Sequence, residues 1–170
     1  MNQIDDIVLI AHNLRSTHNI GSLLRTAEGL GVKRVFLTGY TPYPLQSNDL
    51  RLPHLAAKID KQIAKTALGA ELLVTIKQSE TIEPILAKLK AENYVIVGLE
   101  QSPKSLPLAG YQPPNKIALI VGREVEGLEP EVISACDQLL EIPMLGRKES
   151  FNVVQAAAMA LYHLRYPSSL

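Results

Sequence analysis

The sequence predicts an α/β fold in which a mostly parallel sheet of about six strands carries helices on both faces. Short, continuous apolar runs, such as residues 7–11 and 117–121, are typical of strands that are buried on both faces. These runs alternate with segments of helical periodicity, which indicates strand–helix–strand units. At 170 residues, with 46% hydrophobic and 20% charged residues, the chain is expected to form one globular domain.

The first half of the chain contains three predicted strands and two predicted helices. The strand at 7–11 precedes a polar stretch, 12–19, and a helix that ends before Gly31 as its C-cap. That helix is indicated by apolar residues at helical spacing: Ile20, Leu23, Leu24, Ala27 and Leu30. A strand at 32–37, a long loop at 38–53, a helix at 55–68 and a strand at 71–76 follow.

The second half continues the alternation with a helix at 81–92 and a strand at 94–99. Residues 100–115 include four prolines and are predicted to form a loop, followed by the most apolar strand, 117–121. A short helix begins near Pro130, and the last strand spans 138–142. Pro143 and Gly146 then break the regular backbone, and Ser150 is the predicted N-cap of an alanine-rich helix from 153 to 166.

Charge and cysteine content limit the possible functions. Lys and Arg total 17, as do Asp and Glu, so a protein that coats nucleic acid non-specifically is not expected. One cysteine, Cys136, excludes an internal disulfide and favours a reducing compartment, with its side chain acting as a small apolar residue before a strand. The N-terminus lacks a signal peptide and no apolar run spans a membrane, so a cytoplasmic location is expected.

Positive charge is concentrated before the first helix. His12, Arg15 and His18 precede its N-terminus, where cations are disfavoured unless an anion such as phosphate binds there, and Arg25 could reach the same anion. The alternative is that these residues are solvated at the surface and that Asn19 is an ordinary N-cap. The residues alone leave both interpretations open.

The turn at 122–127 follows a buried strand, where a phosphate-binding loop often lies. It matches no phosphate-loop pattern, and its Glu124 and Glu126 would repel phosphate, so a neutral or cationic ligand fits better; the alternative is an exposed turn. The four histidines show no metal-ligand spacing, and no nucleophile elbow occurs. His163 is expected at the surface, and the six tyrosines are too scattered to predict a stacking platform.

Three segments together resemble the TrmH (SpoU) family of RNA 2′-O-ribose methyltransferases in the SPOUT superfamily. They are residues 13–25, residues 120–128, and residues 142–144 with 149–153; residues 65–71 resemble the linking segment of small stand-alone members. The resemblance covers nearly the whole chain, so a single SPOUT methyltransferase domain over 1–170, without an appended RNA-binding domain, is expected. Phe151 and Val154 depart from the family's third motif, which usually has Leu and Ser there.

The resemblance implies a C-terminal trefoil knot, which sequence rules alone would not predict. It implies that S-adenosylmethionine binds where the loops after Leu99, Val121 and Ile142 meet. The residues implied to contact this cofactor are Leu99, Gly122, Ile142, Met144 and Phe151. It also implies a homodimer in which the catalytic arginine of each site comes from the partner subunit.

The function that follows is transfer of a methyl group to a ribose 2′-hydroxyl of RNA, with tRNA favoured; the alternatives are an rRNA target or a non-catalytic RNA-binding protein with the knotted fold. The catalytic residues implied by the resemblance are Arg25, Asn19, Glu124, Ser150 and Asn152, and those that contact RNA are Asn13 and Arg15. Arg25 is expected to grip the RNA phosphate and Asn19 to hold Arg25. No metal and no membrane partner are expected.

Overall fold

The computed structural model describes residues 6–167 and contains one sheet in the strand order β3-β2-β1-β6-β4-β7-β5, with every neighbouring pair parallel. Its strands are β1 (Asp6–His12), β2 (Arg34–Thr38), β3 (Thr75–Ser79), β4 (Val95–Leu99), β5 (Leu106–Pro107), β6 (Lys116–Val121) and β7 (Gln138–Glu141). The helices are α1 (Thr17–Gly29), α2 (Pro53–Ala67), α3 (Glu83–Ala91), α4 (Pro130–Ala135) and α5 (Val153–Arg165), with one 3-10 turn, η1 (Ala70–Leu72).

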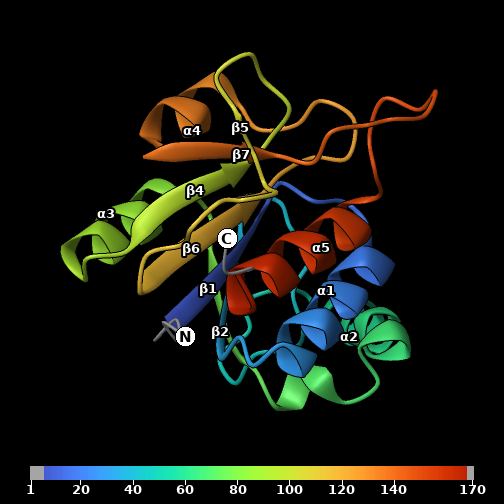
Figure 1. Ribbon diagram of the computed structural model, residues 1–170. Helices are drawn as coiled ribbons and strands as arrows, with labels where there is room; N and C mark the ends of the chain where they lie inside the picture. The colour runs from blue at the N-terminus through green and yellow to red at the C-terminus, as the bar shows by residue number, and fades with distance from the viewer. Residues whose placement is uncertain (1–5, 168–170) are drawn as a thin grey trace.

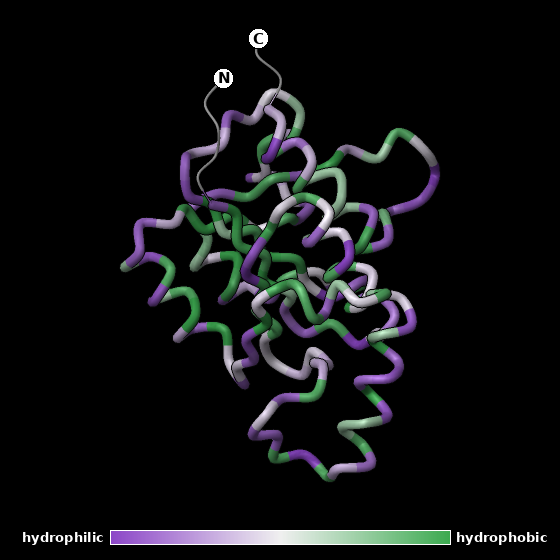
Figure 2. Tube along the Cα trace, turned by 90° about the horizontal axis from the view of Figure 1, so that it is seen from below, coloured by the Kyte–Doolittle hydropathy of each residue, from purple (hydrophilic) through white to green (hydrophobic). Residues whose placement is uncertain are grey.

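Helices cover both faces of the sheet, as predicted. Figure 1 shows α1, α2 and α5 on one side and α3 and α4 on the other, and each group packs on its own buried cluster. Alternate strand residues divide between the clusters: Leu9 and Leu119 face α1 and α5, whereas Ile10 and Ile120 face α3 and α4. The apolar strands therefore occupy the interior, with polar segments around them (Figure 2).

The sheet has seven strands rather than the six predicted. The additional strand, β5, lies inside the predicted loop 100–115 and pairs only Leu106 with Leu140 and Pro107 with Glu141. Two residues carry no recognisable period, and a proline is tolerated there because β5 is an edge strand. So short a strand therefore could not be predicted from the sequence.

Two further local predictions were wrong. The strand predicted at 71–76 begins four residues later, as β3 (Thr75–Ser79), because Leu68 and Gly69 both adopt left-handed conformations and the chain then makes the η1 turn. Ser150 does not cap α5: the backbone stays irregular through residue 151, and the Asn152 side chain accepts the hydrogen bond from Val154 N at 2.9 Å.

The α1 helix is held closely against α2. A Cβ added at Gly21 would overlap Thr66 Oγ1 and the Ile63 carbonyl oxygen and would lie 2.9 Å from Ala67 N. Thr66 Oγ1 also donates a 2.8 Å hydrogen bond to the His18 carbonyl oxygen. Gly21 therefore allows the two backbones to approach, and this contact fixes the helix that carries Asn19 and Arg25.

A polar cluster joins three strands at their amino ends. Arg34 forms ion pairs with Asp6 at 2.9 Å and with Glu92 at 3.2 Å, and the Tyr94 hydroxyl donates a hydrogen bond to Asp6. Burial and the Asp6 carboxylate raise the pKa of Tyr94 to about 12. The cluster lies at the opposite edge of the sheet from the loops that follow the strands.

Two remaining observations concern the rest of the described chain. His163 is half-buried rather than at the surface as predicted, and its Nε2 lies 2.9 Å from the Tyr111 carbonyl oxygen. Within residues 6–167, no helix has the length and apolar character needed to cross a membrane.

Candidate active site

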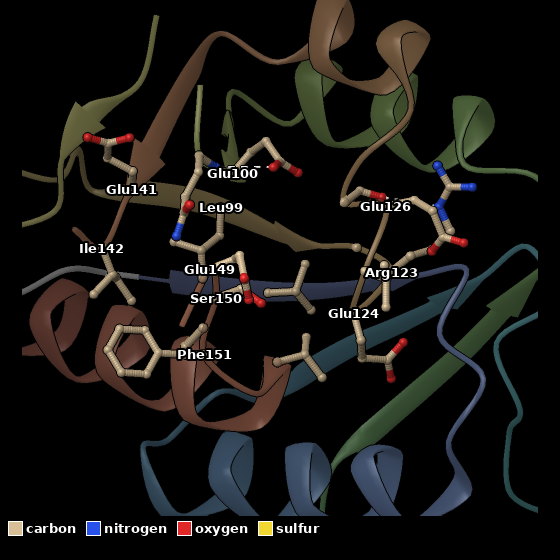
Figure 3. A pocket seen from close by; sticks show the side chains of 17 residues that line it. Leu99, Glu100, Arg123, Glu124, Glu126, Glu141, Ile142, Glu149, Ser150 and Phe151 are labelled. Carbon is tan, nitrogen blue, oxygen red and sulfur yellow. Dashed lines mark hydrogen bonds between the residues drawn. The ribbon is translucent and has the colours of Figure 1, made fainter. Parts of the chain in front are cut away.

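A pocket of about 300 Å³ lies at the carboxyl ends of β4, β6 and β7, the edge at which parallel α/β sheets commonly bind ligands. Three segments distant in sequence form it: residues 99–101, residues 121–127, and residues 141–156 (Figure 3). The residues that line it are Leu99, Glu100, Gln101, Val121, Gly122, Arg123, Glu124, Val125, Glu126, Gly127, Glu141, Ile142, Glu149, Ser150, Phe151, Val153 and Ala156.

The central wall is a tightly folded turn after β6. Glu100 Oε2 accepts a 2.7 Å hydrogen bond from Leu128 N, which fastens this turn to the end of β4. A Cβ at Gly122 would lie 2.6 Å from Leu128 Cδ2 and 3.1 Å from the Gly127 carbonyl group. A side chain at Gly122 would therefore displace the Leu128 side chain and press against the Gly127 backbone.

The pocket combines an apolar wall with an excess of carboxylates. Its apolar lining includes Leu99, Ile142 and Phe151, and Arg123 is its only cationic lining residue. Five carboxylates also line it, several of which are visible in Figure 3: Glu100, Glu124, Glu126, Glu141 and Glu149. This charge pattern disfavours a phosphate chain and favours a ligand that carries positive charge beside an apolar ring system.

Three of the predicted catalytic residues are joined by side-chain hydrogen bonds at the edge of the pocket. Asn19 Nδ2 donates to Glu124 Oε1 at 3.0 Å, and Asn152 Nδ2 donates to Asn19 Oδ1 at 3.5 Å. These residues come from α1, the turn after β6 and the N-cap of α5. The arrangement brings polar groups from three parts of the sequence together at the edge of the pocket, which Ser150 also lines.

Arg25 does not join this group within the chain. Its side chain is exposed, and it makes no hydrogen bond or ion pair with the described residues. Six helical residues separate it from Asn19, which rotates it by roughly 240° and moves it about 9 Å along the axis. Within this chain Asn19 bonds to Glu124 and Asn152 rather than to Arg25. The expectation that Asn19 holds Arg25 therefore stays a prediction for an arginine that comes from a partner subunit.

The other predicted site residues divide into two groups. Four of the five predicted cofactor contacts line the pocket, namely Leu99, Gly122, Ile142 and Phe151, whereas Met144 is half-buried and is not part of the lining. Of the predicted RNA contacts, Arg15 is exposed and Asn13 is half-buried. The roles assigned to these residues stay predictions. Across residues 6–167, no group of three or more His, Cys, Asp or Glu side chains is arranged to hold a metal ion.

Both interpretations of the first loop treated His12 as a solvent-facing residue, and the structure shows that this is wrong. His12 is the last residue of β1 and only 6% exposed, and burial lowers its pKa more than the Glu129 carboxylate raises it. Asn13 Oδ1 accepts from Tyr40 N, so its amide nitrogen faces His12 Nε2 at 3.0 Å. These contacts fit a neutral His12 whose Nε2 accepts from Asn13 Nδ2 and whose Nδ1 donates to Thr38 Oγ1 at 2.8 Å, with Glu129 Oε2 3.4 Å from the same Nε2.

Glu129 is the second part of this buried group. Its Oε1 accepts from Asn13 Nδ2 at 2.8 Å and lies 3.5 Å from Arg123 Nε, whereas its Oε2 is buried without a hydrogen bond to any described residue. Burial acts to raise the pKa of Glu129, but the bond from Asn13 and the nearby charges hold it below its usual value. Glu129 therefore remains ionised and links the first loop to the turn that lines the pocket.

Sequence reasoning missed several residues of this region. Glu100 and Glu141 line the pocket because each stands at a strand end, and that position was the available signal. Glu129 had no comparable signal, because its partners Asn13 and Arg123 lie in different parts of the chain and meet only in the folded sheet.

The fold and the pocket define an α/β domain with a pocket for a small ligand at the carboxyl ends of the strands of a parallel sheet. The chain belongs to the SpoU rRNA Methylase family, whose family model matches residues 6–162. This confirms the predicted family, which the three sequence segments had indicated.

Named relatives and solved structures agree with this assignment. The chain is 31% identical to the 23S rRNA (guanosine-2′-O-)-methyltransferase RlmB of Acinetobacter baylyi, covering 92% of the chain and 58% of the relative. It is 26% identical to the tRNA (guanosine(18)-2′-O)-methyltransferase of Borreliella burgdorferi, covering 93% of the chain and 65% of the relative. The chain thus spans less than two thirds of the length of these two proteins.

The structural comparison shows the same fold. The AdoMet-bound rRNA methyltransferase from Sinorhizobium meliloti superposes with a TM-score of 0.79 at 20% identity, over 96% of this chain and 57% of that one. The A. aeolicus TrmH/SpoU tRNA modifying enzyme gives a TM-score of 0.75 at 23% identity, over 96% and 75% of the two chains. These likenesses confirm the α/β architecture with helices on both faces.

Proposed function

We propose that this protein is an S-adenosylmethionine-dependent RNA methyltransferase that transfers a methyl group to a ribose 2′-hydroxyl. The observation that carries the proposal is the pocket at the ends of β4, β6 and β7, with the bonded residues Asn19, Glu124 and Asn152 at its edge. Family membership and the named activities of the relatives, which methylate guanosine 2′-O positions in 23S rRNA and tRNA, support it.

The chemistry of the pocket fits this cofactor. S-adenosylmethionine carries a cationic sulfonium, an ammonium group and an adenine ring, and when bound it supplies an electrophilic methyl group. The carboxylates of the pocket, such as Glu141 and Glu149, suit the positive groups, and the apolar residues Leu99, Ile142 and Phe151 suit the ring. Phe151, which departs from the family pattern, lines the pocket and so keeps an apolar surface there.

The residues at the edge of the pocket have separate tasks in the proposed reaction. Glu124, held by Asn19 at 3.0 Å, is the proposed acceptor of the hydroxyl proton, and Asn152 and Ser150 orient the ribose. Arg25 is permanently protonated, so it serves as a grip on the RNA phosphate that polarises the hydroxyl rather than as a base. Positioning of this kind accelerates transfer without a metal.

A homodimer completes the proposed site. Arg25 is exposed and rotated away from Asn19, so it is available to a neighbouring subunit rather than to the pocket of its own chain. Exposed side chains on α5, including Met159 and Tyr162, offer an apolar face for such a partner. The expected consequence is that each site receives its arginine from the partner subunit.

The proposed fold also includes the trefoil knot implied by the family. The segment after β7 lies beside the loops after β4 and β6, since all three line one pocket, and this crowding is what threading of the chain would produce. For the substrate we favour tRNA over rRNA, because the formal net charge of zero suits a local grip on a compact RNA better than a broad electrostatic surface.

Calorimetry with S-adenosylmethionine separates the proposed enzyme from a non-catalytic RNA-binding protein. The enzyme is expected to bind the cofactor, and Arg25→Ala is expected to bind it equally well while losing methyl transfer to RNA. Lys33→Ala is the matched control, because it removes an exposed cation at the amino ends of the strands, away from the pocket. It is expected to keep both cofactor binding and methyl transfer. Absence of cofactor binding at millimolar concentration favours the non-catalytic alternative.

A further inference from the structure

An exposed pair of side chains lies next to the site but outside the pocket. The Arg15 guanidinium carbon is 5.8 Å from the centroid of the Tyr40 ring, and Tyr40 is 52% exposed. Arg15 is also exposed and makes no ion pair with the described residues. A contact of this type between exposed groups contributes little to stability, only about 0.5–1 kcal/mol, so folding alone does not explain the pair.

Both loops that carry the pair are locked in place beneath it. Tyr40 N donates a 3.2 Å hydrogen bond to Asn13 Oδ1, and Asn13 itself has a left-handed backbone with φ of 56°. Gly39 also has positive φ, 68°, and any Cβ there would overlap Asn13 Oδ1. Buried Thr41 accepts from Leu14 N at 3.1 Å. Arg15 and Tyr40 are therefore presented from a rigid base.

The same base is connected to the pocket. Asn13 Nδ2 donates to Glu129 at 2.8 Å, and Glu129 lies 3.5 Å from Arg123, which lines the pocket. The pair is thus held at the carboxyl edge of the sheet, at the ends of β1 and β2, beside the site at the ends of β4, β6 and β7.

We propose that Arg15 and Tyr40 bind one unpaired nucleotide of the substrate RNA, with the base stacked on the Tyr40 ring and a phosphate held by Arg15. This inference rests on the proposed function and narrows its substrate class to RNA with an unpaired segment, such as a loop, near the target ribose. Bases within an A-form duplex are stacked on each other and are not available to a protein ring, whereas unpaired bases stack readily on Tyr and Arg.

The test compares two RNAs and a graded set of variants. Fluorescence anisotropy measures the affinity of the full chain for a stem-loop RNA and for a blunt duplex of equal length. Tyr40→Leu keeps an apolar side chain but removes the ring, and it is expected to weaken stem-loop binding about tenfold, since stacking contributes on the order of 1–3 kcal/mol. Tyr40→Phe is expected to bind like the wild type, and neither variant is expected to change duplex binding.

Arg15→Ala tests the phosphate contact. It is expected to lower the slope of log affinity against log salt by about one, whereas the control Lys33→Ala is expected to leave it unchanged. A melting temperature equal to that of the wild type shows that each variant is folded.

The proposal is overturned if Tyr40→Leu binds the stem-loop like the wild type, if it weakens duplex binding equally, or if Tyr40→Phe loses as much as Tyr40→Leu. It is also overturned if the wild type prefers the duplex, or if it binds neither RNA, as it would if the pair served a protein partner. Calorimetry with S-adenosylmethionine on the same preparation tests the proposed function separately, because Tyr40 does not line the pocket.

Discussion

Replacement of Gly21 by alanine tests how closely α1 and α2 are packed. The added Cβ would overlap Thr66 Oγ1 and the Ile63 carbonyl oxygen. Neither group can move away easily, because the Ile63 oxygen is part of the α2 backbone and the Thr66 hydroxyl is bonded to the His18 carbonyl oxygen. Overpacking of this kind costs about 1–3 kcal/mol, and the short contacts place Gly21→Ala at the upper end. Alanine recovers about 1 kcal/mol of helix propensity.

The net expected loss is therefore about 2 kcal/mol, which lowers the melting temperature by about 4 to 8 °C for a chain of this size. Gly29→Ala is the matched control, because it lies in the same helix and its added Cβ would meet no atom within 4 Å beyond its chain neighbours and its own helix backbone. It is expected to leave stability unchanged or to raise it slightly. Urea unfolding at one fixed protein concentration measures the free energy of unfolding of both variants and of the wild type. A Gly21→Ala protein as stable as the wild type would refute the packing described.

Three further predictions concern titratable groups. Because the pKa of Tyr94 is raised to about 12 in the folded state, its contribution to stability is present below pH 10 and is lost as the pH rises from about 10 to about 12; urea unfolding should show this loss in the wild type and not in Tyr94→Phe. Because burial lowers the pKa of His12, the folded state is expected to lose stability as the pH falls below the ordinary pKa of histidine. NMR titration of the His12 ring should give a midpoint below that pKa, and a midpoint at or above it would contradict the neutral assignment. Burial raises the pKa of the Cys136 thiol to about 11, so alkylation by iodoacetamide at pH 8 should be slow in the folded protein and fast in urea; equal rates would mean the thiol is accessible.

The sequence predicted those parts of the fold that depend on local pattern. The apolar runs at 7–11 and 117–121 became central strands, and the helical spacing of Leu23, Leu24 and Ala27 became the buried face of α1. Failures occurred where tertiary pairing decides the outcome. Leu106 and Pro107 form a strand only because β7 lies beside them.

The site shows the same division. The motif residues Gly122, Glu124 and Phe151 meet in one pocket, as the resemblance implied. His12 was misread because its place at the end of a buried strand, rather than its polar neighbours, determines its charge. Tyr40 could not be linked to Arg15 from sequence, since a turn at Gly39 and a hydrogen bond to Asn13 bring them together.

The central claim is methyl transfer to ribose, and nucleoside mass spectrometry tests it most directly. Total tRNA and rRNA from cells that lack this protein would be incubated with S-adenosylmethionine and either the wild type or Arg25→Ala, and then digested to nucleosides. The wild type is expected to produce a 2′-O-methylnucleoside, more readily in tRNA, and Arg25→Ala is expected to produce none. A methyl group found on a base, no methylation of either RNA, or near wild-type activity in Arg25→Ala would contradict the account.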